Sequence, residues 1–246
     1  MRTNLNIRLI ILLVALFLGT APFRAFAQSI VGVCGLDDGL VRVTQQPAFY
    51  LEFVDTTIEG DKISVIKGIH AKNGAKERLD IDMRGTPDAA KANSCGMGFL
   101  LYTGTIIKPT SSAITLLHIP HKFMLGEGIQ GEENTDLKDV SDANTQQEEE
   151  KPIVDKIEVG EEKIDGHPCS IYSITVTYKD DRKVTGKIWE ANDYGDLKPY
   201  LKVILDQPNG QKVYELHNLK IGEPDEGWFE IPEGYAGIAD VMELMR

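Results

Sequence analysis

The sequence predicts a mainly β (α+β) fold, built as one large antiparallel sheet with a few short helices. Short runs rich in Val, Ile, Thr and aromatic residues, separated by Gly, Pro, Asn and Asp, add up to about ten or eleven strands. In residues 79–84, apolar side chains alternate with Asp80, Asp82 and Arg84, the period of a strand with one face in water. An antiparallel sheet this large tends to curl, so we expect a curved sheet.

The N-terminal segment, residues 1–27, has the three parts of a secretory signal peptide. Arg2 and Arg8 supply positive charge, residues 9–18 are apolar, and Ala25-Phe26-Ala27 is a small-x-small cleavage site. The apolar run of about ten residues is too short for a bilayer, which needs roughly 20. We therefore expect an exported protein with no transmembrane segment after cleavage. Its compartment would be the periplasm in a Gram-negative cell and the extracellular space otherwise.

The chain is strongly acidic, with a formal net charge of -12 at pH 7. Loss of the signal removes Arg2, Arg8 and Arg24 and no acid, which makes the charge three units more negative. Nucleic acids and anionic membrane surfaces are polyanions, so this acidity argues against both as partners. The length of residues 28–246 fits a single large β domain.

Three cysteines follow the signal segment. In an oxidising compartment, an odd number predicts one disulfide and one remaining thiol, and spacing alone does not give the pairing. Cys34 and Cys95 both precede Gly in expected loops, whereas Cys169 opens an expected strand. The disulfide that we favour therefore joins Cys34 and Cys95, with Cys169 packed in the interior.

A meander is expected after residue 48. Thr86-Pro87-Asp88 offers an N-cap, a Pro at the first helical position and an acid in the first turn, so a short helix should follow. Pro109 cannot continue a strand ladder and separates the last two runs. The expected strands of this half are residues 48–56, 62–71, 76–84, 98–107 and 113–119.

Residues 131–151 differ from the rest of the chain. Leu137 and Val140 are their only aliphatic side chains larger than Ala, and acids dominate. Such a segment cannot bury enough apolar surface to offset the entropy of ordering, so we expect an acidic flexible loop. It lacks the spacing of a calcium-binding loop, and no metal site is expected there.

The C-terminal half contains the strongest turn signals. Pro208-Asn209-Gly210 is typical of a hairpin. A strand is expected around Trp228–Ile231, and Ala236–Met245 has apolar residues at helical spacing, which favours a short amphipathic helix. The other expected strands are residues 156–164, 169–178, 183–191, 199–206 and 211–221.

The sequence offers little for catalysis. His118 and His121 are separated by Pro120, which excludes the helical geometry of a zinc motif, and no third ligand is evident. His167 and Cys169 could form a thiolate–imidazole pair, but Pro168 argues that His167 still lies in a turn. We therefore expect a non-enzymatic protein with no cofactor, no metal and no catalytic residue.

Three C-terminal segments resemble a family of exported bacterial proteins of unknown function. They are residues 160–176 (GEEKIDGHPCSIYSITV), 186–203 (GKIWEANDYGDLKPYLKV) and 224–235 (PDEGWFEIPEGY). That family is similar to the LolA/LolB/RseB-like superfamily, which includes a periplasmic lipoprotein carrier, an outer-membrane lipoprotein receptor and an anti-sigma-factor regulator. The resemblance covers residues 155–240 well and 49–125 more loosely. It implies a half-barrel with an apolar concave face, which several relatives use to hold acyl chains or lipidated N-termini.

Two functional hypotheses follow. In the first, a cell-envelope protein binds an apolar ligand, a lipid or a lipoprotein acyl chain, in the half-barrel. In the second, the core is filled, and the protein is an interaction or scaffold module whose acidic loop recruits a basic partner. An exported hydrolase would need a site that the sequence does not provide. Candidate residues lining an apolar cavity, each of which could equally belong to the core, are Tyr172, Trp189, Tyr200, Trp228 and Phe229.

Overall fold

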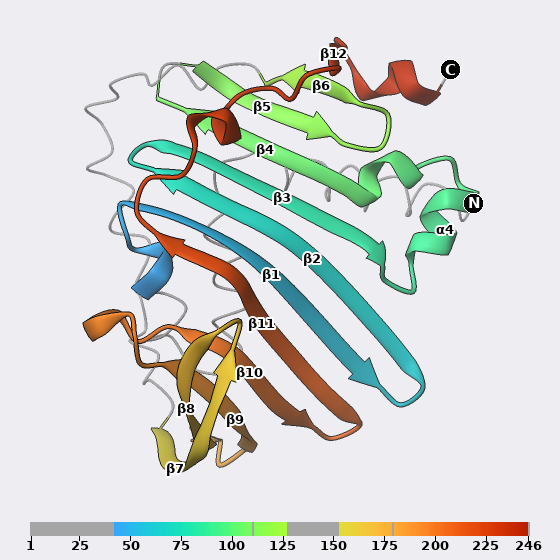
Figure 1. The fold of residues 1–246 in the computed structure, drawn as a ribbon. Coiled ribbons are helices and arrows are strands. Elements are labelled where there is room, and N and C mark those ends of the chain that lie inside the picture. Colours follow the sequence, from blue (N-terminus) through green and yellow to red (C-terminus); the bar gives the residue numbers. More distant parts are fainter. Residues whose placement is uncertain (1–41, 110, 127–152, 179, 246) are drawn as a thin grey trace, which may run out of the picture.

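A computed structural model describes residues 42–109, 111–126, 153–178 and 180–245. It contains one twelve-stranded sheet in the order β12-β6-β5-β4-β3-β2-β1-β11-β10-β9-β8-β7 (Figure 1). Neighbouring strands are antiparallel, apart from β12 and β6, which are parallel. The predicted fold class, a large antiparallel sheet with few short helices, is confirmed. The expected signal segment (1–27), the acidic segment (131–151) and Cys34 lie outside the described residues.

Most elements follow the order that the sequence predicts, but residues 98–101 of the expected strand 98–107 form a 3-10 turn, and the strand at Lys122–Leu125 was not among the expected ones. The strands are β1 (Ala48–Glu59), β2 (Lys62–Asn73), β3 (Lys76–Gly85), β4 (Tyr102–Lys108), β5 (Ser111–Leu117), β6 (Lys122–Leu125), β7 (Ile153–Ile164), β8 (His167–Thr177), β9 (Lys183–Ala191), β10 (Tyr200–Gln207), β11 (Gly210–Ile221) and β12 (Ala236–Gly237). The helices are α4 (Ala89–Ser94) and the 3-10 turns η1 (Gly98–Leu101), η2 (Gly195–Leu197), η3 (Glu226–Phe229) and η4 (Val241–Met245).

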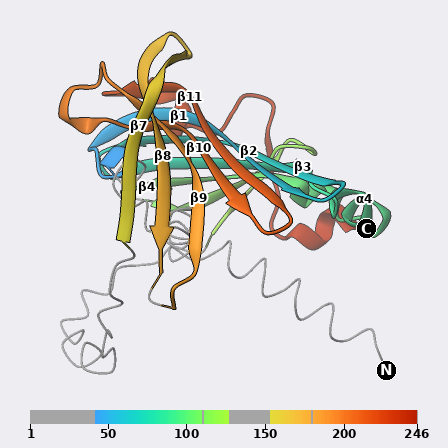
Figure 2. The same ribbon diagram turned by 90° about the horizontal axis from the view of Figure 1, so that it is seen from below.

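Two meanders make up the sheet. Strands β1 to β6 follow one another outward from the centre, and β7 to β11 follow one another back toward it, so that β1 and β11 pair in the middle. Most of the hairpins are short, because an antiparallel pair needs only a tight turn, whereas β3 and β4 are joined through α4 and η1. In Figure 2, β7–β9 stand at a steep angle to β1–β6. The sheet is therefore strongly bent and twisted, as expected for this many strands.

The two faces of the sheet differ in composition. On β1, Phe49, Leu51 and Phe53 lie on one face and are buried, whereas Tyr50 and Glu52 lie on the other. We call the first face the core face. Cross-strand pairing extends it over most of the sheet, and its buried side chains form one cluster, which includes Phe49, Leu51, Phe53, Leu79, Ile81, Ile174, Val176, Ile188, Val203, Leu205, Tyr214 and Leu216.

Several predicted boundaries are confirmed. A short helix, α4, follows Thr86-Pro87-Asp88, and Gly96 ends it with a φ of 74°, in the region that glycine adopts without strain. The hairpin at Pro208-Asn209-Gly210 joins β10 to β11. Within the described parts of the chain, no helix is long and apolar enough to cross a membrane.

Two predictions near the C-terminus are wrong. The expected strand at Trp228–Ile231 is largely the 3-10 turn η3, which is capped by the Asp225 carboxylate accepting from the Gly227 amide at 2.7 Å. The expected helix at Ala236–Met245 is instead the short strand β12 followed by η4. The amides of Ala236 and Ile238 donate to carbonyls at the β6 edge. Pairing with an open strand edge thus replaces the first turn of the expected helix.

His167 is a further correction. The sequence placed it in a turn before Pro168, but β8 begins at His167, and Pro168 lies opposite Lys163 of β7. His167 Nδ1 lies 2.8 Å from Asp193 Oδ2, so its ring is held by a carboxylate. The Cys169 thiol donates to the His167 carbonyl at 3.4 Å rather than meeting the imidazole.

Candidate functional site

The C-terminal segment crosses the sheet on the face opposite the core face. We call residues 222–238 the strap, because they leave β11 and run across the strands to the β6 edge (Figure 1). Glu226 pairs with Lys76 at 2.5 Å and Glu230 pairs with Lys108 at 2.8 Å. These pairs are partly exposed, so each adds little to stability.

Apolar packing attaches the strap more firmly. Phe229 is fully buried in a second cluster on this face, where it packs against Ala71, Ile106, Ile114 and Leu116. Burying a Phe side chain stabilises a fold by about 1.5–3 kcal/mol. Partly buried side chains around this cluster are Tyr50, Phe123, Trp228, Ile231 and Tyr235.

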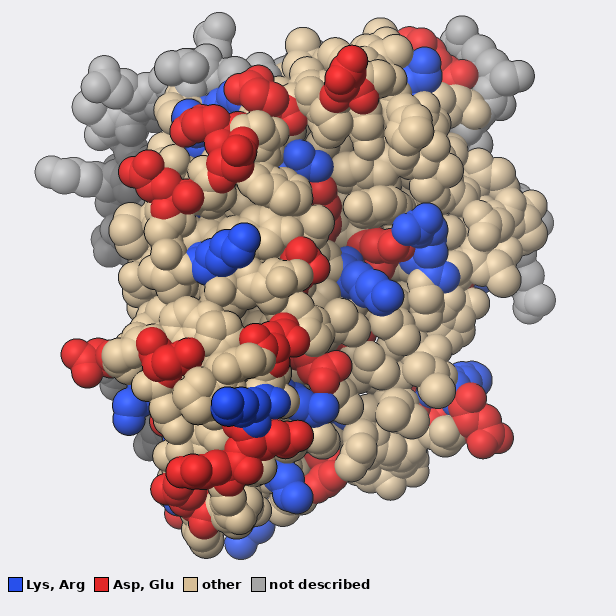
Figure 3. All heavy atoms as spheres, in the orientation of Figure 1, with Lys and Arg blue, Asp and Glu red and all other residues tan. Residues whose placement is uncertain are grey.

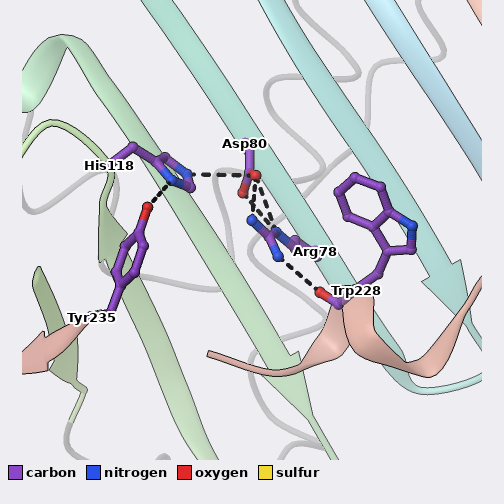
Figure 4. Close-up of polar contacts among 5 residues, drawn as sticks. All are labelled: Arg78, Asp80, His118, Trp228 and Tyr235. Atoms are coloured by element: carbon purple, nitrogen blue, oxygen red, sulfur yellow. Dashed lines mark hydrogen bonds and ion pairs between the residues drawn. The ribbon is translucent and has the colours of Figure 1, made fainter. Parts of the chain in front are cut away.

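Beneath the strap lies a buried ionic cluster. Arg78 and Asp80 are two residues apart on β3, so both side chains point to the strap face. The Arg78 Nε donates to Asp80 Oδ1 at 3.0 Å, and its Nη2 donates to Asp80 Oδ2 at 2.6 Å. Its Nη1 donates to the Trp228 carbonyl of the strap at 3.1 Å (Figure 4). One guanidinium thus connects the sheet to the strap.

His118 extends this cluster from the end of β5. Its Nε2 lies 3.5 Å from Asp80 Oδ2, without a hydrogen bond. Its Nδ1 shares a hydrogen bond of 2.7 Å with the hydroxyl of Tyr235 in the strap (Figure 4). The ring of Tyr102 stacks on the imidazole, with 4.2 Å between the two ring centroids. Gly104 is required here, because a Cβ at that position would collide with the Asp80 carboxylate and approach His118.

The electrostatics of the cluster favour a structural role. Burial alone would raise the pKa of Asp80, but His118 and Arg78 outweigh it and lower that pKa below its ordinary value. Burial raises the pKa of Tyr235, so its hydroxyl stays protonated near neutral pH. The contacts of Asp80 with Arg78 and of His118 with Tyr235 join the sheet to the strap, so this arrangement is suited to holding the strap on the sheet.

The aromatic residues proposed from the sequence lie in separate places. Tyr172 and Tyr200 come together around Lys156, whose Nζ lies 3.8 Å and 5.4 Å from the two ring centroids. Trp189 lies on the opposite face of the sheet, where its indole donates to Glu162 at 2.8 Å. Trp228 and Phe229 lie together in η3 of the strap. A cavity shared by all five stays a prediction.

The predicted disulfide also stays a prediction, since Cys34 lies outside the described residues. Cys95 is exposed at the end of α4, and Cys169 is buried in β8. Burial raises the pKa of the Cys169 thiol, which makes it a poor nucleophile.

The sequence did not identify the buried cluster. Alternation along residues 79–84 assigned Asp80 to a wet face, but only 2% of Asp80 is exposed. The strap, about 150 residues later in the chain, covers that face. The local signal was the repeated pairing of Arg and Asp two positions apart, Arg78 with Asp80 and Asp82 with Arg84. Only tertiary structure distinguishes the buried pair from the exposed one.

Comparisons with known proteins give fold-level similarity. No protein-family model matches the sequence, and no curated protein is similar to it. The chain is similar to the MucA/MucB complex structure of Pseudomonas aeruginosa, with a TM-score of 0.40, 13% identity and coverage of 80% of this chain and 60% of that chain. It thus spans less than two thirds of the length of MucB.

Two further solved structures are similar over nearly their whole length. The lipoprotein LppX of Mycobacterium tuberculosis has a TM-score of 0.38 and 9% identity, over 80% of this chain and 96% of that chain. A LolA superfamily protein of Nitrosomonas europaea has a TM-score of 0.29 and 13% identity, over 83% of this chain and 97% of that chain.

Proposed function

We propose that this chain is an exported, non-enzymatic binding protein of the cell envelope that holds an apolar ligand against its core face. The ligand would be a lipid or the acyl chain of a lipoprotein. The observation that carries the proposal is the composition of the core face, which is largely apolar from β3 through β1 and β11 to β8 and carries two ion pairs, Lys212–Asp55 and Lys156–Glu190. A bent sheet with one apolar face can wrap a flexible hydrocarbon chain.

Apolar burial alone would supply the affinity. Each buried CH₂ contributes about 0.8 kcal/mol, so an acyl chain needs few polar contacts. Half-buried side chains next to the core cluster are where such a chain could enter, and Ile66 and Met83 on this face are of that kind. No catalytic group is needed for this role.

Neighbouring residues on β2 allow a matched test. Ile66 pairs with Asp55 and lies on the core face, whereas Val65 pairs with Thr56 and lies on the opposite face, and both are half-buried. The mature protein would be examined for co-purifying lipid by native mass spectrometry and titrated with a fluorescent fatty acid. We expect Ile66→Trp to weaken binding of the fatty acid and Val65→Trp to leave it unchanged. Absence of lipid from every preparation, together with no fatty-acid binding, would contradict the proposal.

The dense packing of the core face favours a second candidate function. Phe49, Ile188 and Leu216 are at most 1% exposed and belong to one cluster. If no ligand enters, the sheet is a rigid scaffold, and the acidic segment 131–151 is its proposed recruiting element for a basic partner. Deletion of that segment should then abolish partner capture in a pull-down while leaving the melting temperature unchanged. If the deletion variant captures the same partners as the wild type, the segment has no recruiting role.

A further inference from the structure

A groove of about 660 Å³ lies where the strap leaves β11, on the face opposite the core face. It opens between the ends of β1 and β11 and the first residues of the strap. Its size is within the range of ligand sites in proteins, about 300–1,000 Å³. The side chains that characterise it are Tyr50, Glu52, Lys220, Glu223, Asp225 and Trp228.

Two aromatic rings form one wall of the groove. The ring centroids of Tyr50 and Trp228 lie 4.9 Å apart, and the angle between the two ring planes is 44°. The Tyr50 hydroxyl donates to Glu52 Oε1 at 2.8 Å, which fixes both side chains. The guanidinium carbon of Arg78 lies 5.4 Å from the centroid of the Trp228 ring. This indole therefore already makes a cation–π contact, worth about 0.5–2 kcal/mol, with a residue of the chain itself.

The charge of the groove is negative. The groove is lined by three acidic residues, Glu52, Glu223 and Asp225, and by one lysine, Lys220. Glu223 and Asp225 are exposed, so both can meet a ligand in solution. Figure 3 shows acidic side chains along the left side of this face, interspersed with Lys and Arg. Carboxylates beside aromatic rings are the surroundings that guanidinium and ammonium groups prefer.

We propose that this groove binds a basic peptide segment, with an arginine or lysine side chain placed between the Tyr50–Trp228 pair and the carboxylates of Glu223 and Asp225. The groove is larger than one side chain, so it can accept the neighbouring peptide as well. Arginine fits best, because a planar guanidinium stacks on an indole and pairs with a carboxylate at the same time. This inference is independent of ligand binding at the core face.

The test uses a tetra-arginine amide and the mature protein without a histidine tag. The chain has two tryptophans, so an NMR spectrum of the indole N–H groups reports on Trp228 in the groove and on Trp189 as an internal control. We expect tetra-arginine to shift the Trp228 signal and leave that of Trp189 in place. A tetra-citrulline amide has the same shape without the charge and should not shift either signal.

Charge-removing variants locate the contact. The double variant Glu223→Gln/Asp225→Asn should weaken binding of tetra-arginine by about fivefold, since exposed ion pairs are individually modest. The matched control, Glu59→Gln/Glu233→Gln, removes two exposed acids outside the groove and should bind like the wild type.

Three outcomes would overturn the proposal. Equal shifts with tetra-citrulline would exclude recognition of charge, and unchanged binding by Glu223→Gln/Asp225→Asn would exclude this groove. Binding of choline chloride in preference to tetra-arginine would assign the groove to a lipid headgroup instead. Melting temperatures of both double variants should match the wild type, so that lost binding reflects lost contacts.

Discussion

At the scale of single residues, the ion pair of Arg78 and Asp80 determines how the strap is attached. Both side chains are almost fully buried, and their bidentate geometry offsets much of the cost of desolvation. Asp82 and Arg84 form the same contact two residues later on β3, but Arg84 is 54% exposed. The two pairs consist of the same residue types, but one is buried and the other meets solvent, so their contributions to stability can be compared directly.

Removing Asp80 should be much more destabilising than removing Asp82. Asp80→Ala leaves the Arg78 charge buried without its partner, and we expect the free energy of unfolding to fall by about 3–5 kcal/mol. Asp82→Ala exposes an arginine that already meets solvent, and should cost at most about 1 kcal/mol. Urea denaturation measures both values. Equal losses in the two variants would contradict the structural role of the buried pair.

At the scale of elements, the strap is held by contacts from one strand after another. Phe229 supplies apolar burial, Arg78 binds a strap carbonyl, and His118 binds Tyr235. Beyond Tyr235, two backbone hydrogen bonds from Ala236 and Ile238 join the strap to the β6 edge. The hydrogen bond between the Tyr235 hydroxyl and His118 therefore lies directly before the backbone pairing of the strap with the β6 edge.

Loss of the Tyr235 hydroxyl should loosen the end of the strap. We expect Tyr235→Phe to cost about 1 kcal/mol of stability, the usual contribution of one hydrogen bond. The amides of Ala236 and Ile238 should also exchange with solvent faster, as followed by hydrogen–deuterium exchange. Tyr172→Phe, on the core face, is the control and should leave those two amides protected. Unchanged exchange in Tyr235→Phe would show that the β6 pairing alone holds the strap.

At the scale of the whole molecule, the buried cluster connects stability to pH. The pKa of Asp80 in the folded protein is below its ordinary value of about 3.9. The unfolded chain therefore binds the proton more readily than the folded chain does. The stabilisation from Asp80 is fully present above about pH 4 and is lost as the pH falls through the lower, folded-state pKa.

Acid unfolding should reveal this contribution. The free energy of unfolding of the wild type should decline as the pH is lowered below about 4, with Asp80 adding up to about 1.4 kcal/mol per pH unit. Asp80→Asn cannot take up this proton, so its stability should start lower and depend less steeply on pH. Denaturant titrations at several pH values give both slopes, and identical slopes would show that Asp80 does not contribute.

Much of the sheet could be predicted from local patterns. The hairpin at Pro208-Asn209-Gly210 and the helix after Thr86-Pro87-Asp88 depend on backbone preferences of a few adjacent residues, so the sequence located them. Segment 236–245 was misassigned because helical spacing describes one element alone, whereas β12 forms by pairing with β6. The burial of Asp80 could not be predicted for the same reason.

The sequence by itself determined the class of fold, a large antiparallel sheet with few helices, because strand alternation and turn residues act over short distances. Tertiary structure alone decided which faces are buried. It placed Tyr172 and Tyr200 around Lys156, and it brought the strap over Arg78 and Asp80. These contacts join residues up to about 150 positions apart, and burial of a polar group depends on what covers it, which no local pattern contains.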